Sequence, residues 1–227
     1  HAIMNVLEPI FERQFIFHTY ACRKQKGTHR AVQYAFKKAG SCKYFLKLDV
    51  RKYFDSIPHK RLKELLFRII KDRKCLALLF EIIDSYSVSD GRGLPIGNLT
   101  SQFFANYYLS PLDHFVLEKL KPKGYARYMD DIAVFSDSKS ALKNILDEMQ
   151  KFTAPFSLFF KQPVINSCRN GVPFLGYSVS DKRISLLNRT RRRKERKARR
   201  LVYEFNHGLI DEEKFADRIN CMEIAVV

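Results

Sequence analysis

Apolar and polar residues alternate along the chain with two different periods, one typical of helices and one typical of strands. Apolar residues three or four positions apart predict helices, and short apolar runs between turn residues predict strands. The expected helices occupy residues 1–17, 28–40, 62–86 (as one helix or two), 99–109 and 140–152, and the expected strands occupy residues 44–50, a hairpin at 124–135 and short pieces within 172–185. Helices interleaved with antiparallel strands, without internal repeats, predict an α+β fold.

Turn and capping residues set the expected boundaries of these elements. Thr28 is placed to cap the second helix and Gly40 to end it. A glycine-rich loop at residues 91–97 opens the helix that starts at residue 99. Pro111 must end or kink that helix, because proline has no backbone N–H to donate.

The charge balance narrows the classes of partner. The 227 residues include 41 Lys and Arg against 24 Asp and Glu, a formal net charge of +17. Such an excess indicates nucleic acid or an anionic membrane. No apolar run is long enough to span a bilayer, so we expect a nucleic acid and no membrane. The five cysteines form no CxxC pair, which disfavours a zinc ribbon and is typical of reduced thiols. The start at His1 leads us to expect further sequence upstream.

Three acidic residues lie where acids are costly. Asp49 ends the apolar strand at 44–50, and Asp130 and Asp131 form the polar tip of an apolar hairpin. Adjacent, half-buried carboxylates repel, and one protonates unless a cation holds both. Mg²⁺ favours a few carboxylates together with waters and substrate phosphates. Two such ions about 4 Å apart serve an in-line displacement, so the sequence predicts two Mg²⁺ ions, replaceable by Mn²⁺, bound by the three acids and the Val50 carbonyl. The alternative is that Asp-Asp is only a turn.

A basic segment follows the last expected strands. Residues 182–200 contain eleven Lys or Arg, and Leu201, Val202 and Phe205 continue with a helical apolar stripe. A charge run is ordinarily a solvated face, but this density favours a helix that contacts phosphates.

Five stretches in order resemble the motifs of reverse transcriptases, over roughly residues 15–185. Tyr128-Met129-Asp130-Asp131 resembles the YxDD box. The others resemble a basic segment, the preceding aspartate motif of group II intron maturases and retrons, the nucleotide loop with its helix, and the primer-grip hairpin, at residues 20–30, 45–57, 94–102 and 174–177.

This resemblance implies a polymerase right hand that copies RNA into DNA. Residues 1–43 would belong to the fingers. Residues 44–180 would form the palm, an antiparallel sheet backed by helices, with fingers-side helices at 60–90. Residues 181–227 would be a basic connection and the start of a helical thumb. Template RNA, a DNA or RNA primer and dNTPs are the implied partners.

One departure from most relatives points to a subtype. Ile96-Gly97 and Ser101-Gln102 replace Gln-Gly and Ser-Pro, which resembles the reverse transcriptases of diversity-generating retroelements. Those enzymes copy a template repeat with errors at adenines. Ile96 removes hydrogen-bonding capacity beside the nascent base pair, and discrimination built on buried polar contacts relaxes without it. The resemblance also implies a small basic accessory protein (the accessory variability determinant) and a cytoplasmic protein encoded by a bacterium, archaeon or phage.

Two alternatives stay open beside this interpretation. A group II intron maturase or retron enzyme would share most of the motifs, although Ile96 and Gln102 argue against it. A non-catalytic RNA-binding relative would keep the fold as a scaffold, but it has no reason to keep three crowded carboxylates.

The resemblance assigns roles to single residues. Lys161 would join the three acids as a catalytic residue that protonates pyrophosphate. The nucleotide contacts would be Arg51, Lys52, Tyr53, Phe54, Ile96, Gly97 and Gln102. The primer and template contacts would be Arg23, Lys24, Lys26, Tyr128, Met129, Phe174, Leu175, Gly176, Tyr177, Arg191, Arg192, Arg193 and Lys194.

Several of these residues have an ordinary structural explanation as well. Phe54 would either exclude a ribose 2′-hydroxyl or belong to the core. For Tyr53, the position in the motif implies a nucleotide contact, but we expect its ring to pack in the core. Lys161 could equally be a solvated lysine. Arg127 would form a salt bridge or touch substrate, and Asp113 is expected to be structural.

Overall fold

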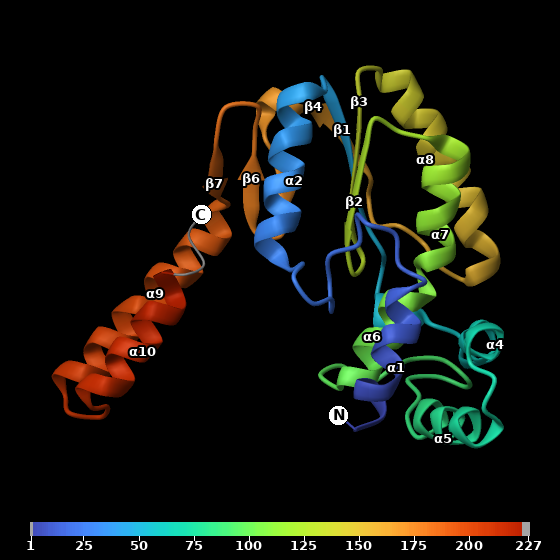
Figure 1. The fold of residues 1–227 in the computed structure, drawn as a ribbon. Coiled ribbons are helices and arrows are strands. Elements are labelled where there is room, and N and C mark those ends of the chain that lie inside the picture. Colours follow the sequence, from blue (N-terminus) through green and yellow to red (C-terminus); the bar gives the residue numbers. More distant parts are fainter. Residues whose placement is uncertain (1, 224–227) are drawn as a thin grey trace.

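The computed structural model describes residues 2–223, and the side chains of residues 2–220. Two antiparallel sheets form its centre (Figure 1). The first has the strand order β2-β3-β1-β4, and the second has the order β5-β6-β7. Their strands are β1 (Tyr44–Asp49), β2 (Gly124–Tyr128), β3 (Asp131–Ser136), β4 (Val164–Ser167), β5 (Val172–Phe174), β6 (Tyr177–Val179) and β7 (Ile184–Leu186).

Helices cover the sheets and extend beyond them. They are α1 (Ala2–Glu12), α2 (Thr28–Ser41), α3 (Tyr53–Ser56), α4 (His59–Ile69), α5 (Arg73–Asp84), α6 (Leu99–Tyr108), α7 (Ser110–Phe115), α8 (Lys139–Thr153), α9 (Asn188–Asn206) and α10 (Glu212–Glu223). Figure 1 shows α2 on the side of the first sheet that faces β6, and α7 and α8 on the other side. Among residues 2–223, no helix has both the length and the apolar character to cross a bilayer.

The period-two alternation of the strands divides the core into two parts. Leu46 and Leu48 of β1 belong to the core under α7 and α8, whereas Phe45 belongs to the core around α2 and the second sheet. Successive strand residues point to opposite faces, so neighbouring residues of β1 enter different cores. Asp49 follows on the face of Phe45, which is therefore the face that carries the site described below.

Helices α1, α4, α5 and α6 gather beyond the strand ends that carry Asp49 and Asp131 (Figure 1). Phe11 of α1 is fully buried, and its ring lies 5.4–6.3 Å from the rings of Phe103, Phe104 and Tyr107. This aromatic cluster fixes α1 to α6, and α6 in turn begins directly after the glycine-rich loop.

Helices α9 and α10 form an arm that leaves the body after β7 (Figure 1). The rings of Phe205 and Phe215 stack at 4.6 Å where the two helices meet. Glu204 accepts from Arg200 at 2.7 Å and lies 3.4 Å from Arg218. Phe205 of the apolar stripe predicted after the basic run is therefore part of the contact between the two helices, whereas Val202 is exposed.

The mixed fold with antiparallel sheets is confirmed, and several boundaries are corrected. The first helix ends at Glu12 rather than 17. Gly40 lies inside α2, which runs on to Ser41, and Thr28 is its first residue rather than its cap. The N-cap position is Gly27, with φ +92°, which has no side chain to cap the helix.

Two further differences have local causes. The helix break lies at Leu109, and Pro111 opens α7 instead of only ending α6, because a proline in the first turn gives up no intrahelical bond. The sequence pattern missed β4, and strand β7 occupies part of the basic segment, which becomes helical only from Asn188.

Candidate active site

The register of the first sheet brings the three acids together at one end of the strands β1 and β3. Asp49, the last residue of β1, lies opposite Asp131, the first residue of β3. Side chains at opposite positions of antiparallel strands have Cβ atoms about 4.5–5.5 Å apart. Asp130 precedes Asp131 in the β2–β3 turn, so two acids distant from Asp49 along the chain share its surroundings.

A lysine lies against each of the paired acids. Lys161 Nζ is 2.6 Å from Asp49 Oδ1, and Lys47 Nζ is 2.6 Å from Asp131 Oδ1. Lys47 was not among the residues predicted for the site, although its place two residues before Asp49 puts both side chains on one face of β1. That alternation is the signal that would have identified it.

The surroundings favour a cation at the acids. Burial raises the pKa of Asp131 above its usual range, and burial together with the charge of Asp49 does the same to Asp130. Oδ1 of Asp49 and Oδ1 of Asp131 are buried, and among the described residues neither accepts a well-aligned hydrogen bond, although an ammonium lies close to each. Both oxygens thus already lie beside a positive charge, as expected of carboxylates whose surroundings favour a cation.

Among the described residues, no three His, Cys, Asp or Glu side chains lie close enough together to hold a metal ion by themselves, so the three acids do not form a complete protein-only site. Mg²⁺ does not need one, since it keeps several waters and binds through one or two carboxylates and substrate phosphates. The donor set at Asp49 and Asp131 fits a hard divalent ion in such an open site.

The turn between β5 and β6 touches these acids. The backbone of Leu175 approaches the carboxylate of Asp131 and lowers the pKa of that group, against the larger effect of burial. Leu175 and Gly176 have φ values of +52° and +85°. The side chains of Phe174 and Tyr177 are buried, so the backbone of the turn between them is the part that lies near the acids, and contact of this hairpin with a primer stays a prediction.

The glycine-rich loop is fastened to the segment that follows Asp49. Leu94 N–H donates to the Phe54 carbonyl at 3.0 Å, and Gly93 N–H donates to the Ile57 carbonyl at 3.0 Å. Ile96 is left 79% exposed, and Gly97 beside it is exposed. Loop and first acid therefore belong to one connected unit.

The four residues after Val50 differ in accessibility. Arg51 and Lys52 are exposed and Phe54 is half-buried, so all three can meet a ligand. Tyr53 is 3% exposed, and its hydroxyl donates to the Ala105 carbonyl. The expectation of a nucleotide contact by Tyr53 is corrected, because its polar group is already bound within the core.

Comparison with known sequences decides the family. The sequence model described as reverse transcriptase (RNA-dependent DNA polymerase) matches residues 1–179. The chain belongs to the reverse transcriptase family.

Individual relatives agree with that assignment. The group II intron-encoded protein LtrA of Lactococcus lactis is 30% identical over 123 residues, which are 52% of this chain and 20% of LtrA. The retron Ec73 reverse transcriptase of Escherichia coli is 31% identical over 143 residues, 57% of this chain and 45% of that protein. The chain thus spans less than half the length of these curated relatives.

The fold has a solved counterpart. An apo telomerase from Candida tropicalis, truncated from its C-terminal domain, matches with a TM-score of 0.64 and 14% identity over 82% of this chain and 45% of that one. At that identity the likeness concerns the fold alone.

The basic segment before α2 in this reverse transcriptase-family chain has mixed roles. Arg23 hydrogen-bonds Glu12 and the carbonyls of Ile16 and Thr19, and its side chain is 7% exposed. A template contact by Arg23 is therefore corrected to a structural bond between α1 and the loop. Lys24 is 82% exposed beside Glu8, so it stays accessible to a ligand.

Two further expected contact residues have partners on neighbouring elements. Lys26 donates to the Phe17 carbonyl at 2.9 Å and lies over the Phe17 ring. Gln102 accepts a hydrogen bond from the Cys22 thiol at 3.4 Å. Both are half-buried, so each can meet a ligand only in part.

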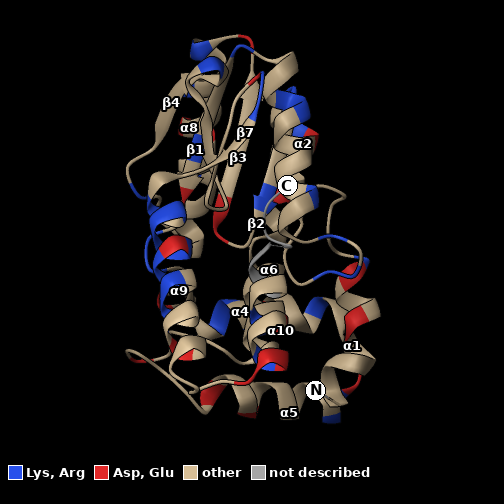
Figure 2. Ribbon diagram, turned by 90° about the vertical axis from the view of Figure 1, so that its left-hand side faces the viewer, with Lys and Arg blue, Asp and Glu red and all other residues tan. Residues whose placement is uncertain are grey.

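Positive charge follows α9 along its length (Figure 2). Arg189, Arg192, Arg193 and Arg196 line one hollow with Thr190. Their spacing of three, four and seven residues places them on one helical face. Of the four residues expected to contact primer and template there, Arg192 and Arg193 lie on this face, whereas Arg191 lies 3.7 Å from Glu195.

Proposed function

We propose that this chain catalyses RNA-directed DNA synthesis, joining a deoxynucleotide from a dNTP to the 3′-hydroxyl of a primer paired with template RNA. The observation that carries the proposal is the pairing of Asp49 with Asp131, next to Asp130, at the end of a sheet in a chain of this family. Carboxylates this close together repel one another when ionised, and a divalent ion that also binds phosphates would offset that repulsion.

Asp49, Asp130 and Asp131, with the backbone carbonyl of Val50, would hold Mg²⁺ ions, for which Mn²⁺ can substitute. Such ions stabilise the charge that develops on the attacking and leaving oxygens of phosphoryl transfer. Lys161 would supply the proton to the leaving pyrophosphate. Its ammonium lies 2.6 Å from Asp49 Oδ1, which places this proton donor beside the acids. That ion pair raises the pKa of Lys161 and so opposes proton release, and transfer would require the contact with Asp49 to be replaced by one with the leaving group.

The right-hand organisation is part of the same proposal. Residues 1–43 would contribute to the fingers, 44–180 would form the palm with fingers-side helices at 60–90, and the arm of α9 and α10 would begin the thumb. Residues 224–227 of that last segment lie outside the described residues. Tyr128 and Met129, both half-buried beside the acids, would support the primer terminus.

A primer-extension assay tests the proposal. Purified chain, Mg²⁺, dNTPs and a DNA primer annealed to RNA are expected to give extended primer, and chelation of the metal with EDTA is expected to stop it. Absence of extension on primed RNA with both Mg²⁺ and Mn²⁺, by a chain that binds the primed template, contradicts the proposal.

Phe54 offers a test of nucleotide choice. Its half-buried ring stands on α3, directly after the strand that carries Asp49, where it would occupy the space needed by a ribose 2′-hydroxyl. Phe54→Ala is expected to narrow the preference for dNTP over rNTP by about 10²-fold, the order at which a pocket separates substrates that differ by one small group. Single-nucleotide insertion with dCTP and CTP measures the ratio, and an unchanged ratio in an active variant assigns Phe54 to the core.

Within the family, we propose the subtype of the diversity-generating retroelements, with error-containing copying of a template repeat and a small basic accessory protein as partner. The support is the exposed Ile96, beside Gly97 on the loop fastened to the Phe54 carbonyl. Ile96→Gln is expected to lower misincorporation opposite template adenines several-fold, because a polar group returns to the loop. Sequencing of the cDNA measures it, and an unchanged error spectrum favours a maturase-like or retron-like enzyme.

A further inference from the structure

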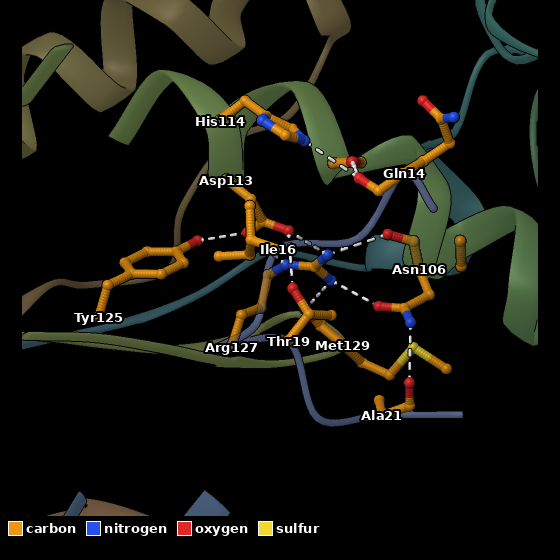
Figure 3. A network of polar contacts seen from close by, with 12 residues as sticks. Gln14, Ile16, Thr19, Ala21, Asn106, Asp113, His114, Tyr125, Arg127 and Met129 are labelled. Atoms are coloured by element: carbon orange, nitrogen blue, oxygen red, sulfur yellow. Dashed lines mark hydrogen bonds and ion pairs between the residues drawn. The ribbon is translucent and has the colours of Figure 1, made fainter. Parts of the chain in front are cut away.

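Arg127 lies behind the candidate active site and is fully buried, as is its partner Asp113. Nε donates to Asp113 Oδ1 at 2.7 Å, and Nη2 donates to Oδ2 at 2.5 Å. Figure 3 shows this two-pronged pair between β2 and α7. Of the two roles considered for Arg127, the structure has the salt bridge, and Asp113 is structural as expected.

The remaining donors of the guanidinium also have partners. Nη1 donates to Asn106 Oδ1 at 2.9 Å and to the Met129 carbonyl at 3.0 Å, and Nη2 donates to the Asn106 carbonyl at 3.0 Å. A guanidinium has five N–H groups, so all five are bonded. One side chain thereby links α6, α7 and the turn between β2 and β3.

Other segments fasten to the same pair. Asp113 accepts from the Tyr125 hydroxyl at 2.7 Å and from Thr19 Oγ1 at 3.0 Å. The backbone N–H of Arg127 donates to the His18 carbonyl at 3.0 Å, and its carbonyl accepts from Tyr20 N–H at 2.9 Å. Saturated networks of this kind rigidify the parts that they join.

The bond to Met129 reaches the residue that sets the acids. Met129 precedes Asp130 and Asp131 and has a φ of +55°, a backbone conformation that residues other than glycine adopt uncommonly. Arg127 lies opposite Ile132 in the β2–β3 ladder, one position from the pair of Tyr128 and Asp131. Because neighbouring positions point to opposite faces, Arg127 approaches the turn from the face that the acids do not use.

We propose that Arg127 is a positioning residue: by holding the Met129 carbonyl from behind the sheet, it fixes the turn that presents Asp130 and Asp131 to the divalent ions and the nucleotide. Asp113 and Asn106 aim the guanidinium. Lysine cannot replace it, since one ammonium lacks the planar fork that bonds a carboxylate and a carbonyl at once. The kinetic part of this proposal rests on the proposed polymerase activity.

Arg127→Lys tests the proposal while keeping a buried cation for Asp113. We expect kcat for primer extension and the affinity for divalent ions each to fall about 10- to 100-fold, as with other residues that orient metal ligands from behind. The KM for dNTP is expected to change less than kcat, because the nucleotide loop is untouched. Titration calorimetry with Mn²⁺ on the free protein measures metal affinity without any need for activity.

Thr19→Val is the matched control. It removes one hydrogen bond to the same carboxylate, and none to Met129. Its melting temperature is expected to fall, while kcat and Mn²⁺ affinity stay as in the unmodified chain. A purely structural role of the network predicts instead that both variants change in the same way.

A double variant covers the case in which Arg127→Lys does not fold. Asp113→Leu with Arg127→Met replaces the buried ion pair by apolar side chains, a change that proteins often tolerate, and it still lacks the bond to Met129. Its Mn²⁺ affinity is expected to fall with native circular dichroism. A folded variant of either kind with unchanged kcat and unchanged Mn²⁺ affinity overturns the proposal. An unmodified chain that binds Mn²⁺ but extends no primer overturns the polymerase assignment instead.

Discussion

Asp131→Asn is expected to lower primer extension by about 10³-fold or more, because bound ions supply several kcal/mol of transition-state stabilisation and each 1.36 kcal/mol is tenfold in rate. Asn keeps the shape of the side chain but removes the charge that holds the ion. Asp131 faces Asp49 across the β1–β3 ladder, so a site shared by the two carboxylates loses half of its paired charge. Single-turnover extension at saturating dNTP, with Mg²⁺ varied, measures the loss.

Asp137→Asn is the matched control. It makes the same chemical change just beyond the other end of β3, where Asp137 pairs with Lys123 at the surface. Extension by this variant is expected to match that of the unmodified chain. Equal losses in both variants, or near-normal activity of a folded Asp131→Asn, would contradict a shared-ion site.

The same two variants are expected to differ in stability in opposite directions. Burial raises the pKa of Asp131, so without metal its ionised form opposes folding above the pKa of the unfolded chain, and stability is gained as the pH falls. The hydrogen bond from Lys123 lowers the pKa of Asp137, so that group stabilises the fold at neutral pH and the effect is lost in acid. At pH 7, without metal, Asp131→Asn should therefore not melt below the unmodified chain, whereas Asp137→Asn should.

Local pattern was sufficient to place the acids. A short apolar strand that ends in Asp49 and an apolar hairpin with a polar tip are both signals of neighbouring residues, and the structure has both elements at the expected places. The register that joins them follows from the need to bury the same faces, since a slip by one residue would turn Asp131 into the core.

Long-range pairing could not be derived in the same way. Strand β4 is short, and Val164 at its start is 42% exposed, so it lacks the apolar run by which strands are recognised. Arg23 lies in a basic segment, which suggested a template contact. In the structure its guanidinium is instead hydrogen-bonded to Glu12, eleven residues away. The choice between a salt bridge and a substrate contact for Arg127 needed the position of Asp113, on a different element. In each case the partner is fixed by packing.

The two lysines beside the acids differ in how exposed they are, and this difference separates a structural role from a chemical one. Lys47 and Lys161 each lie against one acid, which reduces the repulsion between carboxylates that a metal-free chain must bear. Lys47 is enclosed, with 13% of its side chain exposed, whereas Lys161 is 55% exposed. The exposed Lys161 is therefore the one that the proposed reaction would use as a donor, and the enclosed Lys47 is the better permanent counter-charge.

Neutralising one face of α9 is expected to weaken binding to primed template about 10²-fold at low salt and to flatten its salt dependence. Arg189, Arg192, Arg193 and Arg196 line one hollow of that helix. Four phosphate contacts correspond to a slope of about −3 to −4 in log affinity against log salt, hence to roughly 10² between 50 and 200 mM. Replacing all four by Gln is expected to remove most of that slope, as measured by fluorescence anisotropy across this salt range.

The control carries the same change in net charge on another part of the surface. Arg68, Lys71, Arg73 and Lys74 are exposed around the junction of α4 and α5, on the opposite side of the body from the α9–α10 arm (Figure 1). Gln at these four positions lowers the overall field equally but leaves α9 intact. If α9 contacts phosphates directly, the control variant loses much less affinity for primed template than the α9 variant. Equal losses in the two variants would mean that net charge alone attracts the template.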